Sequence, residues 1–325
     1  MAPTPQHVAS DIARLVLRHH RSTDPTHQAT SCQRCLLLLS DAVQPFVAAD
    51  RPVDFVLPAF PVKSPNPAKV LGPLPDLAER MALDLLERLC LRIGDLHPAG
   101  ARILLCSDGR VFSDVVGVSD QAVTAYQRAM ESLLAPGSPI RLFCLDDVTE
   151  FAHLDHQAMR EELVSGYGQP LAEITTGIRA GGPDLPLYRA ITRFLFEDRL
   201  TPDYQGSRAA LQRAARARAY LMIQRSQAWG NLLGDYHPQA VRLSIHPQPC
   251  GSEKTAIQLA GSADGWLTPW HGVAVLRDGR LTLLKRSEAE RLGARLVSLG
   301  GRPDHYVLDQ ATASDRQRLT GAATR

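Results

Sequence analysis

The hydrophobic and polar positions alternate between helical and strand-like spacing over the first half of the chain. Segment 6–20 has apolar side chains at positions 8, 12, 15 and 16, the spacing of one helical face, and predicts an N-terminal helix. Apolar runs at 53–60, 101–106 and 140–145 predict strands, and segments 75–94 and 120–134 predict the helices between them. Helices that alternate with buried strands predict an α/β fold, Rossmann-like, with a largely parallel sheet flanked by helices.

The pattern changes in the second half. Segment 149–202 contains helical pieces broken by Gly181-Gly182-Pro183 and is expected to cover the sheet as an insertion or lid. Segment 207–233 predicts one long helix. Strand-like runs follow at 241–245, 255–259, 272–276 and 281–284, and Asp278-Gly279 predicts a hairpin between the last two.

These patterns divide the chain into five expected segments. They are an N-terminal helical segment (1–50), the Rossmann-like core (51–150), a helical insertion or lid with the long helix (151–235), a β-rich part that completes the active site (236–310), and a flexible tail (311–325).

Composition and charge exclude several classes of protein. Hydrophobic residues make up 44% of the 325 residues and charged residues 22%, which is typical of soluble globular proteins. The net charge of +2 is too small to attract nucleic acid or anionic lipid through the overall field. No apolar run approaches the roughly 20 residues of a membrane-spanning helix, and the first 22 residues lack the pattern of a signal peptide. We therefore expect a cytoplasmic protein that binds neither nucleic acid nor membranes.

The cysteine pattern gives little support to metal chemistry. Six cysteines in so long a chain fit a reducing compartment. Cys32 and Cys35 form a C-x-x-C motif, but the second pair of a typical structural zinc site is missing and the segment is helix-like. The sequence alone therefore predicts no metal site and no cofactor.

A proline-rich loop after the first predicted strand is the first candidate for chemistry. Residues 57–72 contain four prolines and two lysines. Ligands of open α/β sheets bind at the carboxyl ends of the strands, so Lys63, Ser64 and Asn66 are expected to project toward substrate. The alternative is a rigid surface connection with solvated lysines.

Two longer motifs point to a known family. Residues 69–76 (KVLGPLPD) and 107–114 (SDGRVFSD) closely resemble the dityrosine and pyoverdine biosynthesis family, the isonitrile synthases. The resemblance continues through Arg225, residues 241–247 (VRLSIHP), Lys254 and residues 268–272 (TPWHG). It covers roughly residues 53–284.

The resemblance implies a reaction and its substrates. Such enzymes condense the α-amine of an L-amino acid, tyrosine or tryptophan foremost, with the C2 ketone of ribulose 5-phosphate, whose C2 becomes the isonitrile carbon. The product would enter secondary-metabolite biosynthesis, with a separate Fe(II)/2-oxoglutarate oxygenase as a partner that acts on it. The site must hold a phosphate and a carboxylate and must move protons, but it needs no redox cofactor.

The resemblance also implies which residues form the site. The catalytic candidates are Lys63, Asp108, Asp114, His246 and His271. The substrate-binding candidates are Ser64, Asn66, Lys69, Arg110, Arg225, Arg242, Ser244, Lys254 and Trp270. Structural alternatives exist for several of them, because Asp108 could cap its turn, Trp270 could pack in the core and the histidines could be hydrogen-bonded there.

Strand periodicity suggests a division of labour. Arg242 and His246 lie four residues apart on the predicted strand, so their side chains should share one face with Ser244 between them, about 13 Å apart at roughly 3.3 Å per residue. We expect Arg242 to anchor phosphate and His246 to shuttle protons. Two other functions fit the same residues: a phosphosugar-binding lyase or transferase that forms no isonitrile, and a non-catalytic ligand-binding protein.

Overall fold

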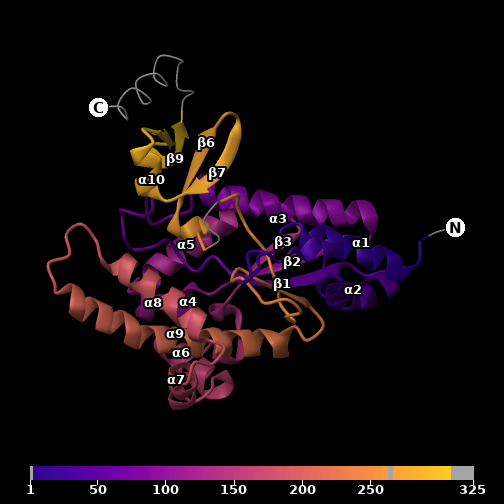
Figure 1. The fold of residues 1–325 in the computed structure, drawn as a ribbon, viewed down its shortest axis with the longest axis horizontal. Helices are drawn as coiled ribbons and strands as arrows, with labels where there is room; N and C mark the ends of the chain where they lie inside the picture. The colour runs from indigo at the N-terminus through magenta and orange to yellow at the C-terminus, as the bar shows by residue number, and fades with distance from the viewer. Residues whose placement is uncertain (1–2, 263–265, 309–325) are drawn as a thin grey trace.

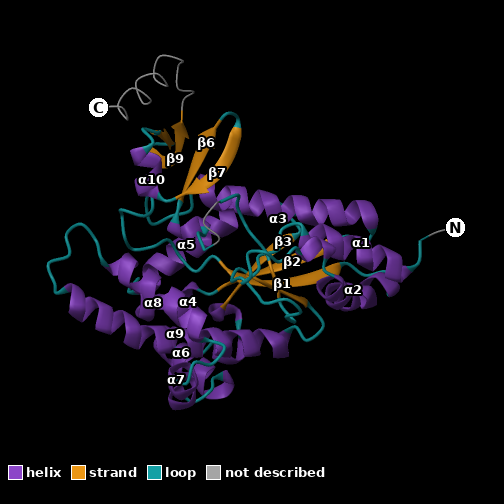
Figure 2. Ribbon diagram, in the orientation of Figure 1, coloured by secondary structure: helices purple, strands orange, loops and turns teal. Residues whose placement is uncertain are grey.

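The computed structural model describes residues 3–262 and 266–308, and its first sheet is the centre of the molecule (Figure 2). All neighbouring strands of this sheet run parallel, in the order β3-β2-β1-β4-β5. The five strands are β1 (Val53–Ala59), β2 (Ala101–Ser107), β3 (Ile140–Cys144), β4 (Val241–Ser244) and β5 (Thr255–Ala256). The predicted strands thus form a parallel sheet, which confirms the α/β fold class.

Helices cover both faces of this sheet (Figure 1). One core cluster packs Phe55 and Leu57 of β1 against α1 (Pro5–Leu17), α2 (Gln33–Ala48), α3 (Leu77–Leu96) and α5 (Asp120–Leu133). The other packs Val56, on the opposite side of β1, against α4 (Gly109–Val116), α6 (His156–Tyr167), α7 (Leu171–Arg179), α8 (Leu185–Arg199) and α9 (Arg208–Tyr236). Because side chains alternate along a strand, one apolar run supplies both clusters.

Local sequence signals set several helix ends. Asp76 and Glu79 form a capping box at the start of α3, the helix predicted over 75–94. Helix α4 was not predicted, because residues 107–109 read as a turn. A Cβ at Gly109 would lie 1.9 Å from the carbonyl oxygen of Pro61, so only glycine lets α4 begin this close to the loop after β1.

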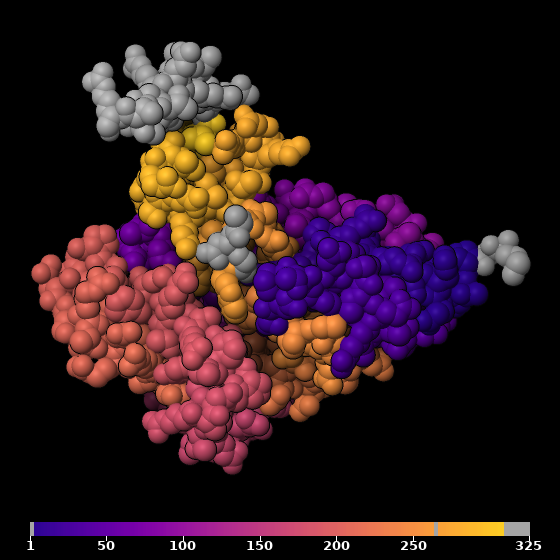
Figure 3. All heavy atoms as spheres, viewed as in Figure 1, coloured from indigo at the N-terminus to yellow at the C-terminus, as the bar shows by residue number. Residues whose placement is uncertain are grey.

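The strands after Pro238 divide between two sheets. β4 and β5 complete the central sheet, whereas the last four strands form a mixed sheet in the order β7-β6-β9-β8. This second sheet stands out from the body of the molecule (Figure 3). Its elements are β6 (Val273–Arg277), β7 (Arg280–Leu284), α10 (Arg286–Arg291), β8 (Arg295–Leu299) and β9 (Arg302–Leu308).

The predicted hairpin joins β6 and β7, and Asp278 and Gly279 both have the positive φ that such a turn requires. β8 and β9 were not predicted. Residues 309–325, which include the expected tail, lie outside the described residues. Short 3-10 segments complete the order of elements: η1 (Ala29–Ser31), η2 (Leu145–Asp147), η3 (Thr149–Phe151) and η4 (Pro269–His271). None of the helices in the described ranges is long and apolar enough to span a membrane.

Candidate active site

A cavity of about 510 Å³ lies where β1, β2 and β4 end. Its wall combines the loop after β1, the end of β2, helix α8, the turn after β4 and the segment around η4. This is the carboxyl edge of the parallel strands, where open α/β sheets bind ligands. Eight of the sequence-predicted residues line it: Lys63, Ser64, Asn66, Lys69, Asp108, His246, Trp270 and His271.

The charged centre of this wall is Asp198, near the end of α8. One carboxylate oxygen accepts a hydrogen bond from the Ser64 hydroxyl at 2.8 Å and pairs with the ammonium of Lys69. The other lies 3.2 Å from Nε2 of His271, whose Nδ1 is 3.0 Å from the hydroxyl of Thr268. Asp198 therefore joins a loop residue, a cation and an imidazole into one network.

Electrostatics keep this carboxylate ionised. Burial alone would raise the pKa of Asp198, but His271 and Lys69 outweigh it and hold the pKa well below its usual range. A permanently charged Asp198 fixes the orientation of His271. Burial lowers the pKa of His271 and the charge of Asp198 opposes this shift only in part, so the imidazole stays available to accept a proton inside the cavity.

Lys63 contacts protein carboxylates and does not offer its charge to substrate, which corrects the sequence prediction. Its side chain is 0% exposed, and its ammonium lies 2.8 Å from both Asp76 and Glu79 and donates to the carbonyl of Pro269. These contacts use all three of its donors. Burial would lower the pKa of Lys63, but Glu79 and Asp76 more than offset it and raise that pKa, while burial raises the pKa of Glu79 to about 7.

Ser64 and Asn66 hold the loop in place through their side chains. Ser64 donates to Asp198, and the Asn66 amide donates to the carbonyls of Glu197 at 2.7 Å and Leu200 at 3.1 Å. The Asn66 carbonyl accepts from the backbone N–H of Ala68. Both residues line the cavity, but their polar atoms clamp the loop to the end of α8.

Asp108 places a second carboxyl in the cavity wall. It follows β2 and precedes α4, but its side chain makes no capping hydrogen bond, so the turn-capping alternative is wrong. Its Oδ1 is buried without a hydrogen-bond partner among the residues that the structure describes. Burial raises the pKa of Asp108 to about 7, which suits a group that exchanges protons near neutrality.

His246 and Arg21 form the wall on the β4 side. Burial, aided by the positive charges of Arg21 and Lys254, lowers the pKa of His246 to about 4, so this imidazole is neutral near pH 7. Arg21 donates to the carbonyl of Ile245 at 2.6 Å and holds this turn against the N-terminal segment. Trp270 is 2% exposed and packs on Phe60, with ring centroids 5.1 Å apart.

Six predicted residues do not line the cavity, and three of them belong to ion pairs around α4. Arg225 forms a two-pronged ion pair with Asp114, which joins α9 to α4. Burial would raise the pKa of Asp114, but the hydrogen bond and charge of Arg225 lower it. Arg110 is 2% exposed and is held by Asp120 and Asp146. We interpret all three as residues that fasten helices together.

The prediction that Arg242 and His246 share one face of a strand is wrong. β4 ends at Ser244, whose hydroxyl accepts from the backbone N–H of His246 at 3.0 Å and turns the chain. Arg242 instead donates to the carbonyl of Gly230 on α9 at 2.5 Å, and Lys254 lies nearby. Arg242, Ser244 and Lys254 are not among the residues that line the cavity, although Lys254 influences His246.

The structure adds cavity residues that sequence reasoning missed. Asp198 lies outside the motifs that carry the resemblance, and no local signal marked it. The missed cations Arg21, Lys285 and Arg286 sit outside the recognised motifs. An apolar wall from α4, α8 and α9 completes the cavity, with side chains of Phe112, Val116, Leu187, Ile191, Phe194 and Met222.

The sheet, the cavity at its carboxyl edge and the two motifs define a family. The family model described as "Pyoverdine/dityrosine biosynthesis protein" matches residues 43–297. The chain belongs to this family, and the resemblance seen in its motifs is confirmed.

Individual relatives agree over most of the chain. An L-tyrosine isonitrile synthase of Pseudomonas aeruginosa is 47% identical, with 95% of each chain covered. An L-tryptophan isonitrile synthase of Fischerella ambigua is 38% identical, with 93% of this chain and 96% of the relative covered. The crystal structure of the PvcA protein from Pseudomonas aeruginosa matches with a TM-score of 0.88 and 46% identity, over 93% of this chain and 99% of that one.

Proposed function

We propose that this protein is an isonitrile synthase that converts the α-amine of an aromatic L-amino acid, tyrosine or tryptophan, into an isonitrile. Ribulose 5-phosphate is the carbon donor. The observation that carries the proposal is the cavity, whose lining combines an apolar wall with cations and titratable groups. The names of the relatives, L-tyrosine and L-tryptophan isonitrile synthases, support the same reaction.

The apolar and the charged residues of the lining suit different parts of the two substrates. The wall of α4, α8 and α9 offers Phe112, Ile191 and Phe194 to an aromatic side chain. Arg21, Lys69, Lys285 and Arg286 offer positive charge to the phosphate and the carboxylate. A cavity of about 510 Å³ falls within the ~300–1,000 Å³ of small-molecule sites.

The titratable groups divide the proton transfers. His271, held by Asp198, is placed to accept a proton from the substrate ammonium or from the condensing amine. Asp108, whose raised pKa keeps it protonated up to about pH 7, is placed to donate a proton to the hydroxyl that leaves the carbinolamine. His246, neutral at the same pH, is a second acceptor.

The test combines purified protein with L-tyrosine or L-tryptophan and ribulose 5-phosphate labelled with ¹³C at C2. Trapping with a tetrazine should capture an isonitrile whose carbon bears the label. Consumption of the pentulose phosphate without amino acid would favour the phosphosugar lyase or transferase. Binding of both substrates without turnover would favour a ligand-binding protein. The proposal also places the product in secondary metabolism, upstream of a separate Fe(II)/2-oxoglutarate oxygenase.

A further inference from the structure

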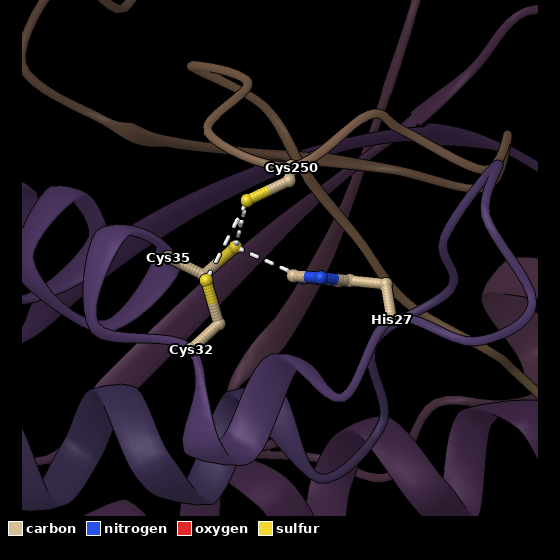
Figure 4. A group of neighbouring side chains, drawn as sticks. All are labelled: His27, Cys32, Cys35 and Cys250. Carbon is tan, nitrogen blue, oxygen red and sulfur yellow. Dashed lines mark hydrogen bonds between the residues drawn. The ribbon is translucent and has the colours of Figure 1, made fainter.

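Three cysteines and one histidine meet outside the active-site cavity (Figure 4). Cys32 precedes α2 and Cys35 lies in its first turn, whereas Cys250 belongs to the loop after β4. His27 comes from the turn before η1. The sulfur atoms and one ring nitrogen all lie within 4.8 Å of one another. The second half of a zinc-binding motif, missing from the local sequence, is therefore supplied by the fold.

The spacing of these atoms matches a tetrahedral metal site. Sγ of Cys250 lies 3.5 Å from that of Cys32 and 3.8 Å from that of Cys35, and Nε2 of His27 lies 3.4 Å from Cys35. Zn–S bonds of about 2.3 Å and Zn–N bonds of about 2.0–2.1 Å at tetrahedral angles put neighbouring sulfurs about 3.8 Å apart and sulfur and nitrogen about 3.6 Å apart. All six cysteines are free thiols, and these contacts are far longer than a disulfide bond.

The local backbone shapes the cluster. The backbone N–H of Cys35 points at the sulfur of Cys32. Gly251, with a φ of +76°, lets the chain turn directly after Cys250, and a Cβ there would lie 2.2 Å from Nε of Arg34. The guanidinium of Arg34, within the C-x-x-C motif, therefore packs against the turn that presents Cys250.

We propose that His27, Cys32, Cys35 and Cys250 bind one structural Zn²⁺ ion through three thiolates and Nε2 of the imidazole. Each thiol releases one proton to solvent as its Zn–S bond forms, and no electron is transferred. This Cys₃His set is one of the ligand sets of closed structural zinc sites, and it leaves no position for substrate.

The ion would clamp the N-terminal segment to the loop that carries His246. Backbone hydrogen bonds already join the N-terminal segment to this loop and to β5. The N–H of Gln248 donates to the carbonyl of Arg21 at 3.2 Å, and the N–H of Arg21 donates to the carbonyl of Ala256 at 3.0 Å. His246 and Arg21 both line the active-site cavity. The zinc would thus stabilise the wall of the active-site cavity that His246 and Arg21 form.

The experiment measures zinc in untagged full-length protein purified under reducing conditions. We expect one zinc per chain by elemental analysis, and the absorption of tetrahedral cobalt thiolate after Co²⁺ replacement. Cys250→Ser should weaken zinc binding by roughly 100-fold or more in competition with a chromogenic chelator, because even changes around the ligands cost about 10–100-fold. Cys250 is exposed, so this variant should fold, which circular dichroism checks.

Cys90→Ala is the matched control, because this buried thiol lies on α3 away from the cluster. It should keep one zinc per chain. A strong zinc chelator should lower the thermal midpoint of wild type and of Cys90→Ala, and should leave Cys250→Ser unchanged. The proposal fails if reduced wild-type protein retains no zinc after loading and gel filtration, or if Cys250→Ser binds zinc as tightly as wild type. The proposal is also overturned if the isolated protein contains a Cys32–Cys250 disulfide and binds no zinc after this disulfide is reduced.

Discussion

Lys63 and Lys69 belong to the same loop, and each pairs with buried carboxylates, but their surroundings differ. Lys63 is enclosed between Asp76, Glu79 and the carbonyl of Pro269, with a side chain 0% exposed. Lys69 pairs with Asp198 and keeps an exposed fraction of 18% on the wall of the cavity. A lysine whose ammonium donors all bind protein groups therefore contributes to stability. A lysine whose ammonium faces a cavity can bind a ligand.

Among the variants proposed here, Lys63→Ala should have the largest effect, a loss of folding stability. Removing the ammonium leaves Asp76 and Glu79 buried without their cation, which costs about 3–5 kcal/mol in comparable buried pairs. Denaturant unfolding should show this loss in the free energy of unfolding. Lys69→Ala should lose less, because Asp198 keeps His271 and Ser64 as partners. An inactive Lys63→Ala with wild-type stability would restore the sequence-based role of Lys63 as a substrate contact.

Asp198→Asn should chiefly damage the network that Asp198 forms with Ser64, Lys69 and His271 at the cavity wall. The amide keeps the shape of Asp198 but removes the charge that pairs with Lys69 and stabilises protonated His271. We expect kcat to fall by about 10²–10⁴-fold, the range for losing general acid–base help or its orienting carboxylate. Asp203→Asn, an exposed position just after α8, is the control and should keep wild-type kcat. Equal kcat in both variants would remove Asp198 from the mechanism.

The two lysines also indicate how far sequence reasoning reaches. Strand positions, the capping box of α3 and the hairpin at Asp278 follow from local periodicity and turn chemistry, so they could be predicted. The proline-rich loop and the motifs named eight residues of the cavity wall, but not Asp198 or the cations Arg21, Lys285 and Arg286. Side-chain partners could not be predicted, because Asp198 and Pro269 are far from Lys69 and Lys63 in sequence and meet them only in the fold. Cys250 escaped prediction as a partner of Cys32 for the same reason.

Asp108→Asn should give a smaller loss with a distinct pH signature. The pKa of Asp108 is raised to about 7, so the carboxyl is protonated below that pH and ionised above it. As the proton donor it should make kcat/KM fall as pH rises through 7. The variant should lose roughly 10²-fold in kcat/KM, and that falling limb should disappear. A rate that instead rises through pH 7 in wild type and becomes flat in the variant would make Asp108 the proton acceptor.

The smallest effect should come from the ion pair of Asp114 and Arg225, which the motifs had placed in the active site. The pair joins α4 to α9, and neither residue lines the cavity. Because the side chain of Asp114 is 47% exposed, solvent screens the interaction, and a double-mutant cycle with Asp114→Asn and Arg225→Gln should give about 0.2–1 kcal/mol of coupling in unfolding experiments. Steady-state kcat and KM for both substrates should stay within about twofold of wild type, since no interaction with the transition state is removed. A large rise in KM for ribulose 5-phosphate in Arg225→Gln alone would mean that this guanidinium leaves Asp114 to bind phosphate. Arg225 would then belong with the substrate-binding residues and not with those that only join helices.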